Sequence, residues 1–145
     1  MKRNKKFILW FKDISHKDVP LVGGKNASLG EMISSLSKEG VNVPNGFSIT
    51  TFSYRYFLRE AGLEEKIKKV LSSLDVKNLK LLHQKGEEVR NLIKRATLPG
   101  DLEKEILNHY FQLSKQYGER ETDVAVRTSA TAEDLPSASF AGQYW

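Results

Sequence analysis

A glycine pair followed by a lysine, Gly23-Gly24-Lys25, stands directly before a helical pattern of apolar residues. Glycines let backbone N–H groups approach a ligand closely, and the start of a helix offers N–H donors and the positive end of its dipole. Lys25 adds a mobile full charge at the same place. The combination suits an anion, most naturally a phosphate, although the tripeptide alone is more typical of a glycine-rich turn with a solvated lysine.

This lysine does not belong to a Walker A loop. That motif needs a glycine at the position occupied here by Val19, and a serine or threonine where this chain has Asn26.

A second cation, Arg127, follows a short apolar run at residues 124–126 and precedes several hydroxyl side chains. Its guanidinium is a rigid fork of donors that matches phosphate oxygens, and the end of a strand holds a side chain with little positional freedom. The hydroxyls within residues 128–131 can donate further hydrogen bonds. An ordinary turn in which Arg127 pairs with Glu133 or Asp134 is the alternative, and the residue types leave it open.

A loop of small side chains at residues 137–143 is the third element that suits a phosphate. Side chains such as Ser139 and Ala141 permit a close approach of the backbone, and Gly142 permits unusual dihedral angles. Phe140 either anchors this loop by packing or belongs to an ordinary core, and we favour the anchor.

No cluster of residues predicts a metal site or a catalytic nucleophile. The chain has no cysteine, and His16, His83 and His109 have no suitably spaced histidine, cysteine or carboxylate beside them. We interpret all three histidines as structural or surface residues. Glu133 and Asp134 could coordinate Mg²⁺, but adjacent acids in a loop more often cap a helix or stay solvated.

The elements that must position these groups follow from hydrophobic spacing and turn residues. A helix that begins at Lys25 or Asn26 carries an apolar stripe and ends near Gly40, which suits a left-handed cap. Its stripe consists of Leu29, Met32, Ile33 and Leu36. We further expect strands at 6–11, 47–50 and 124–126, a loop at 15–24, and helices at 51–61, 63–74, 79–95 and 101–117. Thr51 or Ser53 is the expected cap of the first of these helices.

This order predicts one mixed α/β (α+β) domain with a central cluster of helices. The 145 residues suffice for one core, and a hydrophobic content of 39% is ordinary for a globular protein. The net charge of +5 does not indicate nucleic-acid binding, because lysines alternate with glutamates along the expected helices. No apolar run has the length of a membrane span. We expect a cytoplasmic protein without nucleic-acid or membrane partners.

Three blocks, at residues 22–32, 43–47 and 124–143, resemble the N-terminal region of the phosphoenolpyruvate synthase and pyruvate phosphate dikinase family, which includes the rifampin phosphotransferases. The resemblance runs from about residue 8 to the end of the chain. The last block is the most specific because it is long and unusual in composition. Thr128 stands where many relatives have serine.

The resemblance implies an ATP-grasp-like domain that transfers a phosphoryl group from ATP to a histidine on a separate domain. A third domain then passes the group to pyruvate, which gives phosphoenolpyruvate, AMP and phosphate, or to another acceptor. Lys25 and Arg127 would bind the phosphates of ATP from opposing sides, and the loop at 139–142 would close over the γ-phosphate.

The resemblance also implies that residues 1–145 are a truncated N-terminal portion of such a domain. In the family, the Mg²⁺ ligands, most adenine contacts and the acceptor histidine follow beyond this region. We therefore assign no catalytic or metal-binding residue to the chain and expect it to be inactive alone. The alternatives are the corresponding part of a rifampin-type antibiotic phosphotransferase, a non-catalytic ATP-binding module and a basic helical binding protein.

Overall fold

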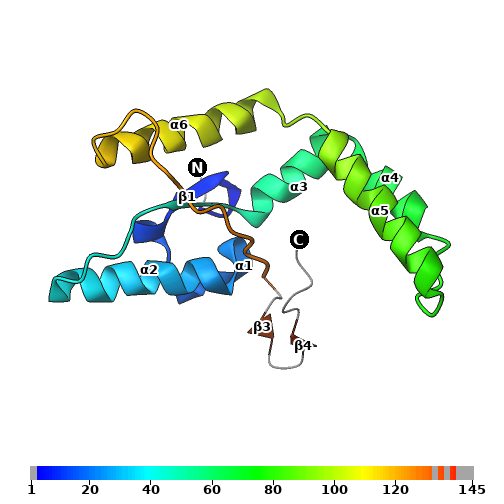
Figure 1. The fold of residues 1–145 in the computed structure, drawn as a ribbon, viewed down its shortest axis with the longest axis horizontal. Coiled ribbons are helices and arrows are strands. Elements are labelled where there is room, and N and C mark those ends of the chain that lie inside the picture. The colour runs from blue at the N-terminus through cyan, green and yellow to red at the C-terminus, as the bar shows by residue number, and fades with distance from the viewer. Residues whose placement is uncertain (1–2, 132–133, 136–137, 140–145) are drawn as a thin grey trace. The chain divides into compact units, whose positions relative to one another are not determined.

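The computed structural model describes residues 3–131 and the backbone of residues 134–135 and 138–139. The chain divides into two compact units, one formed by Met1–Ser53 with Lys104–Trp145 and the other by Tyr54–Glu103. Figure 1 traces the chain through its helices and strands.

The regular elements cover most of the described residues. In chain order they are η1 (Arg3–Lys5), β1 (Ile8–Trp10), η2 (Phe11–Asp13), η3 (His16–Asp18), α1 (Val19–Val22), α2 (Gly24–Leu36), η4 (Ser37–Glu39), β2 (Phe47–Ile49), α3 (Thr51–Glu60), α4 (Leu63–Leu71), α5 (Leu79–Arg95), α6 (Gly100–Gln116), β3 (Asp134–Leu135) and β4 (Ala138–Ser139), where η marks 3-10 helices. The predicted helices are confirmed, and α5 has the predicted bounds.

A two-stranded antiparallel sheet organises the first unit. β1 pairs with β2, so that Ile8 lies opposite Ile49 and Trp10 lies opposite Phe47. Aromatic and β-branched residues suit such a pair. The core beside this sheet consists of Leu9, Ile14, Val22 and Ala27.

Helix α2 packs into this unit through its small residues. Ala27 is fully buried, and a Cβ on Gly30 would lie 2.9 Å from Cβ of Ile14 and overlap the Ile14 carbonyl. The helix can approach the 14–18 segment closely only because these side chains are small. The predicted apolar stripe lies on another face and is partly exposed, with Met32 at 45%. Gly40 follows η4 at φ 80° and ψ 7°, which confirms the left-handed cap.

The start of α3 is tied to the N-terminal strand by hydroxyl groups. Thr50, which precedes the helix, accepts a hydrogen bond from Ser53 N at 3.3 Å and donates one to Lys6 O at 2.8 Å. Ser53 donates to Phe7 O at 2.6 Å. The predicted caps Thr51 and Ser53 are therefore wrong. The helix already begins at Thr51, and Thr50 takes the capping role.

Helix α6 holds two loops of the first unit. The Tyr117 hydroxyl, just beyond the helix, accepts a hydrogen bond from Asn45 N at 2.9 Å. Near the same end, Ser114 accepts from Thr122 N at 3.1 Å, and Tyr110 donates to Thr122 O at 3.0 Å. Ser114 is 1% exposed. The chain thus leaves α6 from a fixed point before it reaches the segment that contains Arg127.

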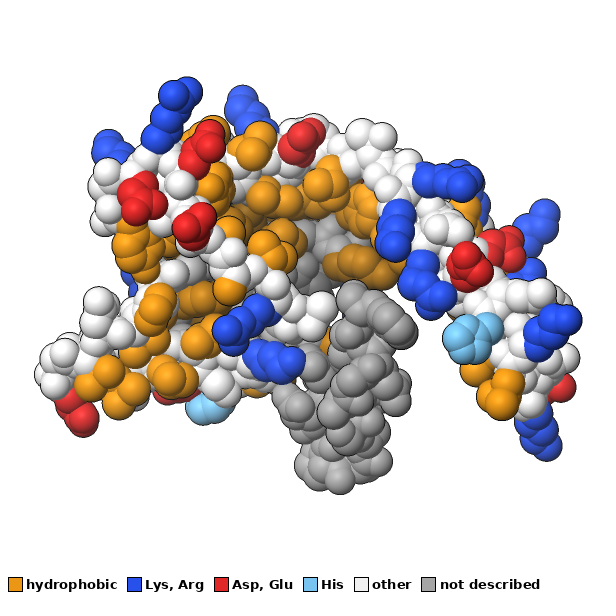
Figure 2. All heavy atoms as spheres, viewed as in Figure 1, with side chains coloured by type: hydrophobic (Ala, Val, Ile, Leu, Met, Phe, Trp, Pro, Cys, Tyr) orange, Lys and Arg blue, Asp and Glu red, His pale blue; other side chains and the backbone are white. Residues whose placement is uncertain are grey.

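The second unit is built around α4 and α5, which pack against each other. Leu63 and Val70 are its buried positions on α4. On the surface, Lys68 pairs with Glu65 at 2.7 Å, and Lys85 pairs with Glu88 at 3.0 Å. Figure 2 shows cationic and anionic side chains mixed over these helices. This mixture agrees with the solvated helix faces predicted from the sequence.

Two predicted elements differ from the structure. Residues 124–126 do not form a strand, since no strand among the described residues pairs with them, and Val126 is 93% exposed. The expected loop at 15–24 contains η3 and α1, because Ser15 and Asp18 form a capping box and Pro20 lies in the first turn of α1, where proline is tolerated.

The described chain is a mixed, helix-rich fold with two sheets of two strands each. β3 and β4 pair so that Asp134 lies opposite Ser139. Within the described residues, every helix is too short or too polar to cross a membrane.

Candidate phosphate-binding site

The glycine-lysine loop joins α1 to α2. Gly23 has φ 79° and ψ 163°, a backbone conformation that residues other than glycine rarely adopt, and it is the N-cap of α2. Its carbonyl accepts the first hydrogen bond of the helix, from Ala27 N at 3.1 Å. Lys25 lies in the first turn of α2 and is exposed. The loop therefore places a cation at the surface of the first unit, whereas Gly23 at the helix start is buried.

The segment after Arg127 lies directly against this loop. Ser129 Oγ donates a hydrogen bond of 2.5 Å to Val22 O. A Cβ added to Gly23 would lie 2.8 Å from Ala130 O and 2.9 Å from Ser129 O. The backbone at 129–130 therefore approaches Gly23 so closely that a side chain there would not fit. The two segments that the sequence predicts to bind phosphate are about a hundred residues apart in the chain, and they are in contact in the structure.

Asn26 connects this contact to the sheet. Its side-chain amide donates to Val22 O at 3.0 Å and to Ser48 Oγ at 2.8 Å. Ser48 belongs to β2 and is 3% exposed. A serine or threonine, as in a Walker A loop, has one hydroxyl proton and could not donate to both acceptors. The residue that departs from that motif thus has a structural role, which local sequence patterns do not predict.

Arg127 is exposed. It forms no ion pair with any side chain that the structure describes. The alternative pairing with Glu133 or Asp134 concerns side chains outside the described part. Arg127 lies between two fixed points, Thr122, which is hydrogen-bonded to Ser114 of α6, and Ser129, which is hydrogen-bonded to Val22 before the glycine-lysine loop.

The closing loop is described only at its beginning. Ser139 pairs with Asp134 through the backbone, whereas Phe140, Ala141 and Gly142 lie outside the described residues. Ser129, expected to donate to a ligand, directs its only hydroxyl proton at Val22 O.

An ion pair also holds the segment that precedes α1 and the glycine-lysine loop. Asp18 precedes α1 and accepts hydrogen bonds from Arg3 Nε and Nη2, both at 2.9 Å, and from Ser15 N at 3.0 Å. The hydrogen bonds from Arg3 lower the pKa of the Asp18 carboxyl, and they outweigh the opposite effect of burial. The pKa of Arg3 is raised by the same pair. Asp18 is therefore a charged structural anchor.

The histidines that the structure describes lie in surroundings that do not suit a metal ion. His109 Nδ1 lies 2.9 Å from Glu105 O, and its ring packs against Trp10 and Phe47 with centroid distances of 5.2 and 5.7 Å. His16 donates its backbone N–H to Glu31. Among the described residues, no group of three or more histidine, cysteine, aspartate or glutamate side chains is arranged to hold a metal ion.

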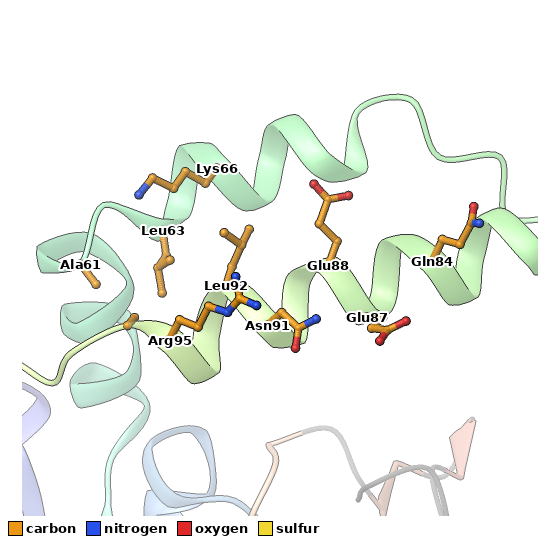
Figure 3. A pocket seen from close by; sticks show the side chains of 10 residues that line it. Ala61, Leu63, Lys66, Gln84, Glu87, Glu88, Asn91, Leu92 and Arg95 are labelled. Carbon is orange, nitrogen blue, oxygen red and sulfur yellow. The ribbon is translucent and has the colours of Figure 1, made fainter.

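A separate pocket of about 570 Å³ lies in the second unit, between α4 and α5. Figure 3 shows Lys66 and Arg95 toward one end of it, and Gln84 and Glu88 toward the other. Its charged side chains are exposed. Its two carboxylates, Glu87 and Glu88, offset the charges of Lys66 and Arg95, so the pocket offers a triphosphate no net positive charge. The loop at 22–26 is the better candidate for a phosphate ligand.

Known proteins are similar to this chain over most of its length. Residues 19–145 match the family described as "Pyruvate phosphate dikinase, AMP/ATP-binding domain". The chain is 50% identical over 141 residues to the phosphoenolpyruvate synthase of Aquifex aeolicus, covering 97% of this chain and 16% of the relative. It is 50% identical over 140 residues to the phosphoenolpyruvate synthase of Synechocystis, covering 94% of this chain and 17% of the relative.

The probable phosphoenolpyruvate synthase of Methanocaldococcus jannaschii is 49% identical over 138 residues, with 95% of this chain and 11% of the relative covered. The chain thus spans about a sixth or less of the length of these relatives. The family match includes both the lysine loop (residues 22–26) and the arginine segment (residues 123–130). The chain belongs to the pyruvate phosphate dikinase AMP/ATP-binding domain family.

Proposed function

We propose that this chain forms one side of the ATP site of a phosphotransferase of the phosphoenolpyruvate synthase type. The observation that carries the proposal is the contact between Ser129 and Val22, which brings the arginine segment to the lysine loop. Family membership and the names of the relatives support the identity of the nucleotide. The complete domain would be ATP-grasp-like.

In the proposed reaction, Lys25 and Arg127 neutralise charge on the phosphates of ATP. Phosphoryl transfer depends mainly on positioning and charge stabilisation, so a cation on each side of the triphosphate is suitable equipment. The loop at 139–142 closes over the γ-phosphate. Mg²⁺ accompanies the nucleotide and is held by residues elsewhere in the parent protein.

ATP gives up two phosphoryl groups as it becomes AMP: one is released to water as phosphate, and the other reaches pyruvate by way of a histidine on another domain. With water consumed in the overall reaction, pyruvate and ATP give phosphoenolpyruvate, AMP and phosphate. We propose that the present chain alone does not complete this sequence. Incubation with ATP, Mg²⁺ and pyruvate should therefore produce no AMP, and robust AMP formation would contradict that statement. The cytoplasmic location stays a prediction.

The binding proposal is tested by calorimetric titration of the chain with ATP and with tripolyphosphate. Lys25→Ala and Arg127→Ala should each weaken binding of both ligands by about tenfold or more, because each removes a charge-assisted contact. Matched controls are Lys38→Ala and Arg120→Ala, which remove other exposed cations of the same unit. If the controls weaken binding as much as the test variants, the attraction is only a matter of net charge.

A further inference from the structure

We propose that Ser129 is a positioning residue that sets Arg127 in register with Lys25. This inference rests on the proposed function for its ligand, ATP. It adds a role to a hydroxyl that does not itself face the nucleotide. The basis is a chain of hydrogen bonds from Ser129 to Val22, from Asn26 to Val22, and from Asn26 to Ser48.

The chain of hydrogen bonds converges on one carbonyl. Val22 O is at the end of α1, where the turn at Gly23 directs the backbone away from the helical path. It accepts from Ser129 Oγ at 2.5 Å and from Asn26 Nδ2 at 3.0 Å. Both lone pairs of this carbonyl are therefore used. One donor comes from the lysine helix and the other from the arginine segment.

The second fixed feature is the close approach of the backbones. Residues 129 and 130 lie over the Cα of Gly23, where a Cβ would come within 2.8 Å of Ala130 O. This packing limits how far the arginine segment can slide along the loop. The hydrogen bond from Ser129 then selects one register within that limit.

Each cation is close to this contact along the chain. Lys25 lies two residues after Gly23, and Arg127 lies two residues before Ser129. Both are exposed, whereas Val22 is 2% exposed. A shift of the contact between residues 129–130 and Gly23 would therefore change the separation of the two charged groups, although none of the residues in this contact binds the ligand. Phosphates bind more tightly when the two cations are correctly separated, because charge-assisted hydrogen bonds need good geometry.

The first test is nucleotide-free. Steady-state ¹H–¹⁵N NOE values of the complete chain are compared for the wild type, Ser129→Ala and the control Ser35→Ala, an exposed serine on α2. Ser129→Ala should lower the values at residues 127–130 while that of Ala27 stays unchanged. Unchanged values at 127–130 would overturn the proposal. The unchanged core signals also show that the variant is folded.

The second test is a double-mutant cycle in ATP affinity. Ser129→Ala should weaken ATP binding about three- to tenfold, which is the range for the loss of one neutral hydrogen bond. In an Arg127→Ala background it should have almost no further effect, because there is no longer an arginine to position. The same fold-loss in both backgrounds would contradict the proposal. If the wild type does not bind ATP, the proposed function fails, and the NOE comparison still decides the role of Ser129.

Discussion

The lysine loop and the arginine segment are held in different ways, although both carry a cation proposed for the same ligand. The lysine loop is built into the core, with Val22 at 2% and Ala27 at 0% exposed. The arginine segment is attached at Thr122 and Ser129, and between these points Val126 is 93% exposed. One side of the candidate site is thus made by local packing, and the other is held by a few distant contacts.

The largest expected effect concerns the packing of the lysine helix. Gly30→Ala places a Cβ against the backbone carbonyl of Ile14, which cannot move as a flexible side chain can. We expect a loss of about 1–3 kcal/mol in the free energy of unfolding of the first unit, measured by urea denaturation. The matched control is Gly86→Ala within α5, where the new Cβ meets only the Arg90 guanidinium at 3.3 Å.

The control should have the opposite sign. Alanine within a helix is about 0.5–1 kcal/mol more favourable than glycine, so Gly86→Ala should not destabilise the second unit. If Gly30→Ala proves equally harmless, the close approach of α2 to the core does not hold in solution.

Acid should weaken the anchor of the lysine loop. The pKa of Asp18 is lowered in the folded protein, so its contribution to stability is complete above the unfolded pKa of about 3.9 and is lost as pH falls through the lower folded pKa. Asp18→Asn should cost about 1–3 kcal/mol at neutral pH. The difference from the wild type should shrink below about pH 4.

Thermal unfolding across this pH range measures the effect. Glu39→Gln, which changes an exposed carboxylate on η4, serves as the control and should follow the wild type. An Asp18→Asn penalty that stays constant down to the lowest pH would refute the assignment to ionised Asp18.

The smallest effect is expected in the arginine segment. Val126→Ala should change the free energy of unfolding by less than about 0.5 kcal/mol, because its side chain is 93% exposed. The same substitution at Val22, which is 2% exposed, should cost about 1–3 kcal/mol. Denaturant titration of both variants tests the contrast, and similar losses would show that residues 124–126 are packed.

The sequence was a good guide where structure depends on neighbouring residues. The left-handed turn at Gly40 and the bounds of α5 follow from local spacing and side-chain preferences. The presence of a glycine-lysine turn before α2 follows from the same rules. Its contact with Ser129 was not predicted, because no local rule relates segments so far apart. The family resemblance implied only that Lys25 and Arg127 bind the same phosphates.

The failures have a common cause in contacts with distant parts of the chain. An apolar run such as 124–126 becomes a strand only when another strand supplies its hydrogen bonds, and none of the described strands does so. The role of Asn26 depends on Ser48 in β2 and on a carbonyl freed by the turn at Gly23. Spacing along the chain contains neither piece of information.

We propose above that the lysine loop and the arginine segment together hold the phosphates of ATP. The most direct measurement is the change in backbone amide NMR signals of the ¹⁵N-labelled chain on titration with ATP. We expect saturable shifts at residues 23–27 and 127–130, which are lost in Arg127→Ala. No saturable shift, or shifts confined to the α4–α5 pocket around Lys66 and Arg95, would contradict it.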